Sequence, residues 1–212
     1  MKTLLCFALL SVAAHATTIY VDSEAANTIN NSGHATVDLE GALPPNPLWA
    51  PALPGSDWIS YGPTGDLDDP SYFSPPDGTV VTFTTQFMLT GEITGAILWV
   101  MAADSTSVVL NGQTLIAADM NPGTVCFSAP VGCVTWTEGL FTSAQLDPFL
   151  VDGVNTLSFG VLQLGGGSFG LDFAGSVDDA PTPEPATVAV LSLGLAGLAS
   201  MAALRRRDHL VI

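Results

Sequence analysis

The chain has 212 residues, of which 20 are acidic and only 4 are basic, so its formal net charge at pH 7 is −16. All four basic residues, Lys2 and Arg205–Arg207, lie near the two ends, and residues 17–204 contain neither lysine nor arginine. Such a polyanion repels phosphate backbones, which excludes nucleic-acid binding, and it has no cation with which to clamp a phosphate or carboxylate substrate.

The first sixteen residues have the three parts of a secretory signal peptide. Lys2 supplies the positive n-region, Leu4–Val12 the apolar h-region, and Ala14-His15-Ala16 the A-x-A cleavage site. The apolar run is too short to span about 30 Å of hydrocarbon, which argues against an N-terminal membrane anchor. We therefore expect signal peptidase to cleave after Ala16.

The body, residues 17–180, has the composition of one loop-rich, all-β extracellular domain. Thr17–Val21 and Ala35–Leu39 are short β-compatible runs at its start. Gly41–Gly78 is rich in proline and glycine, which excludes a helix and allows only brief strands. The aromatic residues of this segment predict an ordered wrap; they are Trp49, Trp58, Tyr61, Tyr72 and Phe73.

Clear strand patterns begin in the middle of the body. Val80–Thr90 alternates apolar with polar residues, which predicts a half-buried strand. Ala96–Ala103 is apolar on both faces and predicts a central strand that is covered on both sides. Val108–Leu110 and Thr114–Ala117 flank Asn111-Gly112, which predicts a hairpin with a type I′ turn.

The remainder of the body predicts a short helix and two further strands. Thr142–Leu146 offers a cap and one or two helical turns, and Leu157–Val161 alternates as a strand does. Gly165-Gly166-Gly167 predicts a turn, because a phosphate loop would be followed by a lysine and a helix. The last strand carries Leu171 and is expected to end before Val177. Together these elements predict a single β-sandwich.

Cys126 and Cys133 are the only cysteines that remain after export. In an oxidising compartment, two cysteines so close in sequence predict a structural disulfide. Two cysteines without a nearby histidine cannot complete a tetrahedral zinc site.

The tail, residues 181–212, has three parts in a set order. Pro181–Pro185 is a rigid linker, Ala186–Leu204 runs without a charge, and Arg205-Arg206-Arg207 follows. At about 1.5 Å per residue the apolar run reaches about 28 Å, which predicts a C-terminal transmembrane helix. The arginines hold that end in the cytoplasm, so the body faces outward, as the signal peptide also requires.

This tail resembles the PEP-CTERM sorting signal of Gram-negative bacteria. The residues that match it are Pro183, Glu184, Pro185, Arg205, Arg206 and Arg207. The same module is also named an ice-binding protein C-terminal domain, a name that describes the tail and does not make the body ice-binding. The resemblance implies processing by an exosortase near the motif. It also implies delivery to the cell surface or the exopolysaccharide matrix.

The body resembles the galactose-binding-like jelly rolls of exported proteins. Ala103–Gly112 and Gly153–Phe159 carry this resemblance. In that fold the first segment forms a strand and hairpin, and the second begins a late strand after a short helix. The resemblance implies a jelly-roll-like sandwich. It transfers no ligand-binding residue, because binding loops vary between members.

The densest acidic cluster is Asp66-Leu67-Asp68-Asp69-Pro70. Asp66, Asp68 and Asp69 are candidate ligands of a structural Ca²⁺, because hard cations prefer several carboxylates on one loop. The EF-hand pattern fails, since Pro70 replaces a ligand and no glycine occupies the sixth position. That failure favours a solvated loop, and no other cofactor is expected.

The candidate residues for stacking on sugar rings are Trp49, Trp58, Tyr61 and Tyr72, because each has an apolar aromatic ring with a polar N–H or O–H group. The alternative is that they fill the ends of the sandwich. Packing is favoured, since each large aromatic side chain buries well over 100 Å².

An enzyme would have to rely on carboxylates or a metal, because the body has one histidine, His34, and no spare thiol. No spacing among the acids selects a pair, and no G-x-S-x-G elbow is present. We expect a non-catalytic, exported protein of the cell surface or matrix that binds carbohydrate such as exopolysaccharide. A polysaccharide-acting hydrolase with a carboxylate pair is the alternative. So is an ice-binding protein, although the sequence lacks repeated threonine arrays.

Overall fold

The computed structural model describes residues 16–41, 43–117, 139–181 and 192–198. Residues 16–180 form one compact unit. Residues 192–198 are helical and exposed. In the part of the chain that is described, no helix has the length and apolar character needed to cross a bilayer.

Several predicted features lie outside the described residues. These are the signal peptide up to His15, the PEP motif at Pro183–Pro185, and the basic stop at Arg205–Arg207. The predicted membrane helix over 186–204 is described only at residues 192–198. Cys126 and Cys133 lie in the segment 118–138, which is also outside. Each of these stays a prediction.

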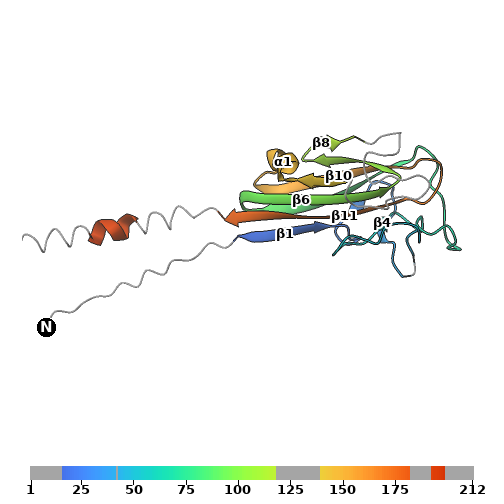
Figure 1. Cartoon of the computed structure of the whole chain (residues 1–212), viewed down its shortest axis with the longest axis horizontal. Helices are drawn as coiled ribbons and strands as arrows, with labels where there is room; N and C mark the ends of the chain where they lie inside the picture. Colours follow the sequence, from blue (N-terminus) through green and yellow to red (C-terminus); the bar gives the residue numbers. More distant parts are fainter. Residues whose placement is uncertain (1–15, 42, 118–138, 182–191, 199–212) are drawn as a thin grey trace, which may run out of the picture. The chain divides into compact units, whose positions relative to one another are not determined.

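The described body is a sandwich of two antiparallel sheets, which confirms the all-β prediction at the level of a β-sandwich (Figure 1). Sheet A has the strand order β3-β4-β11-β6-β9, with β1 also paired to β11, and sheet B has the order β2-β5-β10-β7-β8. The strands of sheet A are β1 (Thr17–Asp22), β3 (Val37–Asp38), β4 (Ile59–Ser60), β6 (Gly91–Ala103), β9 (Leu140–Thr142) and β11 (Gly170–Pro181). Those of sheet B are β2 (Ile29–Asn30), β5 (Val80–Leu89), β7 (Ser105–Leu110), β8 (Gln113–Ile116) and β10 (Gly153–Leu162).

The core lies between the sheets and is built from the alternation that the sequence shows. On β5 and β10 every second side chain is buried, including Phe83 and Phe159. Phe159 stacks on Phe173 of β11 with ring centroids 4.4 Å apart, which joins the two sheets at their centres. Apolar burial of this kind contributes about 25 cal/mol per Å² and is the main force that holds the layers together.

The proline-rich segment covers the outer face of sheet A. Met101 and Ala103 of β6 point away from the main core, and both are buried against side chains of this segment, among them Leu53 and Trp58. The segment has only one short strand, β4, as its proline content predicts. The prediction that β6 is covered on both sides is therefore confirmed, and the wrap is what covers its second side.

The local predictions in the second half of the body are confirmed. Asn111 and Gly112 have positive φ angles of 50° and 80°, as a type I′ turn between β7 and β8 requires. The short helix is α1 (Ser143–Leu146), continued by the 3₁₀ helix η1 (Asp147–Phe149). The backbone N–H of Thr142 donates to Gln145 Oε1 at 3.1 Å, so this helix start is closed by a side chain.

Several predicted strand limits were wrong. β6 begins at Gly91 and not at Ala96, and β10 begins at Gly153 and not at Leu157. The last strand was expected to end before Val177, but β11 runs to Pro181, because β1 pairs with it through the register Thr17↔Asp179. The run Ala35–Leu39 forms only the two-residue strand β3. Its partner β4 is equally short, so there is no longer ladder for it to join.

Candidate functional site

The two tryptophans of the wrap pack against each other. Their ring centroids are 4.3 Å apart, and the exposed fractions of Trp49 and Trp58 are 8% and 1%. The indole N–H of Trp58 donates to the carbonyl of Ala50 at 3.0 Å. Neither ring offers a free face to a sugar in this structure, because both cover sheet A.

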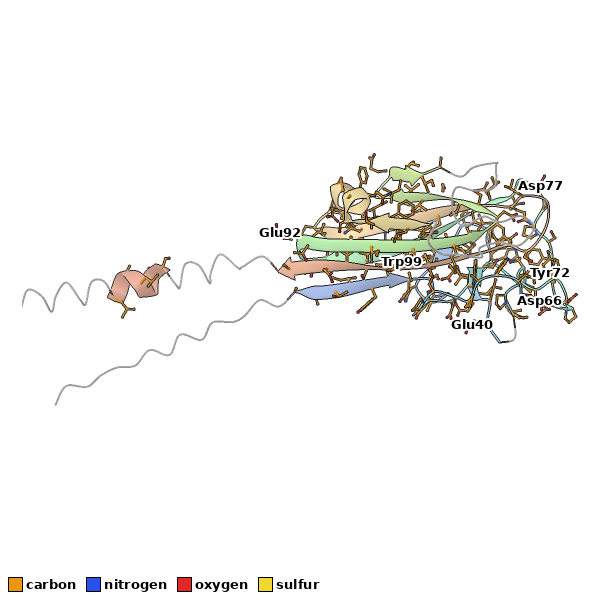
Figure 2. All side chains as sticks on the ribbon, viewed as in Figure 1. Glu40, Asp66, Tyr72, Asp77, Glu92 and Trp99 are labelled. Carbon is orange, nitrogen blue, oxygen red and sulfur yellow. The ribbon has the colours of Figure 1, made fainter. Side chains whose placement is uncertain are left out.

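The two tyrosines of the wrap are half-buried and do not form a common platform. The ring of Tyr61 meets Phe73 and Phe169 edge to face, with centroids 5.6 and 5.5 Å apart, and burial raises the pKa of its hydroxyl. Figure 2 shows Tyr72 at the end of the sandwich opposite Glu92. The four predicted stacking residues are thus not brought together on one surface.

The carboxylates of the predicted Ca²⁺ loop are used by the loop itself. Asp66 Oδ1 accepts the backbone N–H of Asp68 at 2.9 Å, and Asp69 Oδ1 accepts that of Ser71 at 2.6 Å. The hydroxyl of Ser71 also donates to Asp69 Oδ1, and these two bonds lower the pKa of the exposed Asp69. Among the described residues, no three carboxylate, histidine or cysteine side chains are grouped as metal ligands.

A buried carboxylate, which sequence reasoning did not single out, anchors the wrap to β11. Asp172 accepts hydrogen bonds from the hydroxyls of Ser23 and Ser56, at 2.9 and 2.6 Å, and from the backbone N–H of Leu53 at 2.8 Å. Burial raises the pKa of Asp172, and the three donors partly oppose that rise. Its partners lie 116 to 149 residues away in sequence, so no local sequence motif identifies this site.

More acids gather on the same side of the molecule. The charge of Asp57, followed by burial, raises the pKa of Glu40, and burial raises that of Asp22 with a smaller contribution from Asp57. Asp22 belongs to β1, and further acids lie on β3, β6 and β11. Every charged residue in a strand of the sandwich is therefore in sheet A.

Sheet B contains no charged residue in any of its five strands. Six of its outward side chains are short and bear a hydroxyl group. We call these residues the hydroxyl face; they are Thr82, Thr84, Ser107, Thr114, Thr156 and Ser158. All six side chains are half-buried or exposed. In a body this acidic, an uncharged face is the surface that stands out.

Strand register arranges these hydroxyls in rows across the sheet. Thr84 lies opposite Ser158, Ser158 opposite Val109, and Val109 opposite Thr114. The hydroxyls of Thr84 and Ser158 are 3.1 Å apart, and Gln86 Nε2 donates to the hydroxyl of Thr156 at 3.2 Å. Adjacent strands are about 5 Å apart and alternate residues about 7 Å, so the groups form a regular grid.

The sequence contains no repeated threonine motif, and the grid arises only when β5, β7, β8 and β10 are paired. The alternation of residues in β5 and β10 predicts that their polar side chains point away from the core, and the structure confirms this. That these side chains adjoin one another is not evident from the sequence. Two outward apolar residues, Met88 and Val154, are register partners and continue the face without adding charge.

A pair of carboxylates lies at one end of the sandwich. Asp104 Oδ2 accepts the backbone N–H of Leu164 at 2.7 Å, and Asp77 Oδ1 accepts that of Gly165 at 2.9 Å. Burial raises the pKa of Asp104 to about 6, and the charge of Asp77 adds to the rise. The two side chains hold the β10–β11 turn and use one oxygen each to do so.

No protein-family model and no curated protein matches the sequence. A family 35 carbohydrate binding module from Clostridium thermocellum is a structural neighbour with a TM-score of 0.39 and 11% identity, over 74% of this chain and 97% of that one. A second such module, from an environmental isolate, has a TM-score of 0.32 and 12% identity over 74% and 98%. A cleaved adhesin domain of Lys-gingipain from Porphyromonas gingivalis has a TM-score of 0.39 and 14% identity over 78% and 99%. Similarity this low carries no argument about function, which therefore rests on the residues of this chain.

Proposed function

We propose that the protein is an exported, non-catalytic module of the cell surface or extracellular matrix that binds neutral polysaccharide. Its fold is of the jelly-roll-like sandwich type, and its tail is a PEP-CTERM signal that is anchored in the inner membrane during transit and processed by an exosortase. The observation that carries the binding function is the hydroxyl face on uncharged sheet B. The export function is supported by the order of sequence features at the two ends.

The chemistry of the face selects the class of ligand. Serine and threonine hydroxyls both donate and accept hydrogen bonds, as the hydroxyls of sugars do. Anionic polymers are repelled by a body with 18 acidic residues and no lysine or arginine, and cations would be drawn to the acids of sheet A. A neutral polymer with many hydroxyls meets neither obstacle and can engage several rows of the grid at once.

The test is retention of the chain from Thr17 to Ile212 on insoluble neutral polysaccharides, cellulose and chitin, with soluble alginate as the acidic comparison. The double variant Thr84→Val, Ser158→Ala removes two adjacent hydroxyls and keeps the strand shape. We expect it to weaken binding about tenfold or more, because each lost hydrogen bond contributes about 1 kcal/mol.

Thr94→Val is the matched control, since Thr94 is an exposed strand threonine of sheet A. It should bind as the unmodified protein does. Equal binding by the double variant would remove the hydroxyl face from the proposal. Failure of the unmodified protein to bind either neutral polymer would overturn the carbohydrate function and favour a purely structural role in the matrix.

A further inference from the structure

The carboxylate of Asp179 is buried, and one of its oxygens is unmatched. Its exposed fraction is 1%, and Oδ2 accepts the backbone N–H of Thr90 at 2.9 Å and the Thr90 hydroxyl at 3.3 Å. Oδ1 has no hydrogen-bond partner among the residues that the structure describes. A buried carboxylate oxygen without a partner is costly, and residues 17–204 contain no lysine or arginine that could supply one.

The register of sheet A places the start of β1 directly beside this carboxylate. Thr17 is the register partner of Asp179, and Thr18 that of Asp178. The Thr18 hydroxyl donates to Asp178 Oδ1 at 2.6 Å, which fixes β1 at this point. Opposed residues of antiparallel strands have Cα atoms about 5 Å apart, and the backbone nitrogen is about 1.5 Å from its Cα. A small rotation therefore suffices to bring the nitrogen of Thr17 to Asp179.

We propose that signal-peptide cleavage after Ala16 creates the missing partner, because the new α-ammonium group of Thr17 pairs with Asp179 Oδ1. The inference rests on the export part of the proposed function. Hydrolysis of the Ala16–Thr17 bond leaves the oxygen of water on Ala16 as a carboxylate. Both protons of that water go to the nitrogen of Thr17. An uncharged amide with one N–H thereby becomes a cation with three donors.

The pair couples processing to the stability of the sandwich. β1 carries Val21 into the core and closes one edge of β11 along Thr17–Asp22. In the uncleaved chain this edge lacks the ion pair, so β1 is held by its ladder and packing alone. After cleavage the charge-assisted hydrogen bond adds to them, and the domain reaches its full stability as a processed protein.

The composition of the chain makes a selective test available. The protein from Thr17 to Ile212 contains no lysine, so an amine-selective acetylating reagent modifies its α-amino group alone. In detergent solution we expect acetylation to lower the melting temperature by about 5 °C, because it removes the charge that faces Asp179. In Asp179→Asn the same acetylation should change the melting temperature by less than about 1 °C.

Asp68→Asn is the matched control, because Asp68 is an exposed acid on a loop outside sheet A and its replacement should leave the effect of acetylation intact. An equal effect in Asp179→Asn, or no effect in the unmodified protein, would overturn the pair. Should Asp179→Asn not fold, the acetylation rate decides. A paired amine reacts more slowly in the native protein than in urea, whereas equal rates contradict the proposal.

The N-terminus for this test is made by cutting a fusion protein directly before Thr17. The result therefore does not depend on whether cells export the chain. Retention of an uncleaved precursor in cells would count against the proposed function and would leave the measured pair standing.

Discussion

At the scale of single residues, the carboxylates of this protein are arranged to hold backbone. Asp172 accepts two donors from the wrap and one from Ser23 after β1, and Asp77 and Asp104 hold consecutive N–H groups of one turn. With no lysine or arginine in the body, these acids take backbone N–H groups and hydroxyls as partners where other proteins use ion pairs. The energetic consequence is dependence on pH, since burial without a compensating cation raises the pKa of Asp104 and of Asp172.

Asp104 gives a prediction with a defined sign. Its pKa is about 6 in the folded protein against 3.8 for the ordinary group, so the folded state holds the proton more tightly than the unfolded state. The stability that the protonated form contributes is present at pH 4 and is lost as the pH rises to about 6. In Asp104→Asn this part of the pH dependence should vanish. The variant should melt about 5–10 °C above the unmodified protein at pH 7.5 and at the same temperature at pH 4.

The measurement is a series of thermal melts between pH 4 and pH 7.5. Asp152→Asn changes the net charge equally at an exposed loop position and should keep the original profile. Parallel profiles for Asp104→Asn and the unmodified protein would contradict the assignment. Asp22, Glu40 and Asp172 also have raised pKa values, but they are common to both proteins and cancel in the comparison.

At the scale of elements, two sequence motifs that resemble a jelly roll meet in space. The Asn111 side chain, in the β7–β8 turn, donates to Asn155 Oδ1 at 2.7 Å and to the carbonyl of Phe149 at 2.8 Å. Asn155 is fully buried at the start of β10, where it also bonds the backbone of Val151 and Gly153. The Asn111–Asn155 pair thereby fixes the hairpin turn to the end of η1 and to the start of β10.

Removal of the Asn155 side chain should be strongly destabilising. Asn155→Ala leaves several buried backbone groups without partners and removes one of the two acceptors of the Asn111 amide N–H groups, so we expect a loss of about 3 kcal/mol. For a domain of this size that lowers the melting temperature by about 10 °C. Asn27→Ala, at an exposed position, is the control and should change stability by less than about 1 kcal/mol. A melting temperature for Asn155→Ala within a degree of the control would show that water replaces these contacts.

The elements that were predicted correctly are those that local pattern decides. Alternation in β5 and β10 and the Asn111-Gly112 turn are properties of neighbouring residues, and they held. Strand pairing over long sequence separations is not local, which is why the extension of β11 by β1 was missed. The hydroxyl face was missed for the same reason, because its rows exist only across paired strands. Trp49 and Trp58 could not be assigned from the sequence, because a tryptophan can either stack on a sugar or pack in the protein. Only the fold shows that these two pack against each other.

At the scale of the whole molecule, charge is divided between the two layers. The acids that lie in strands are all in sheet A, and the strands of sheet B hold none. Composition alone indicated the net charge and argued against nucleic acid as a partner, yet it could not reveal this division, which depends on strand order. The division gives the molecule a side that is repelled by anionic polymers and a side that is not.

The proposed sorting tail leads to a prediction about the location of the whole chain in the cell. With Pro183, Glu184 and Pro185 all changed to alanine, we expect the protein to accumulate in the inner-membrane fraction, because processing is blocked while the apolar run is kept. A chain that stops after Ala180 should leave the membrane fraction altogether. Cell fractionation and blotting measure both outcomes. Identical distributions for the alanine variant and the unmodified protein would contradict a role of the motif in sorting.

Strand β11 lies inside sheet A, where it pairs with β1 and β6, and it runs directly into the tail at Pro181. Any pull on the tail therefore enters the sandwich along the axis of this strand. Hydrogen bonds in an antiparallel ladder are perpendicular to the strands, so such a pull loads those on both flanks of β11 together, in shear, and does not open them one at a time. A protein tethered by this end and bound to a matrix by sheet B would carry tension through both layers of the sandwich.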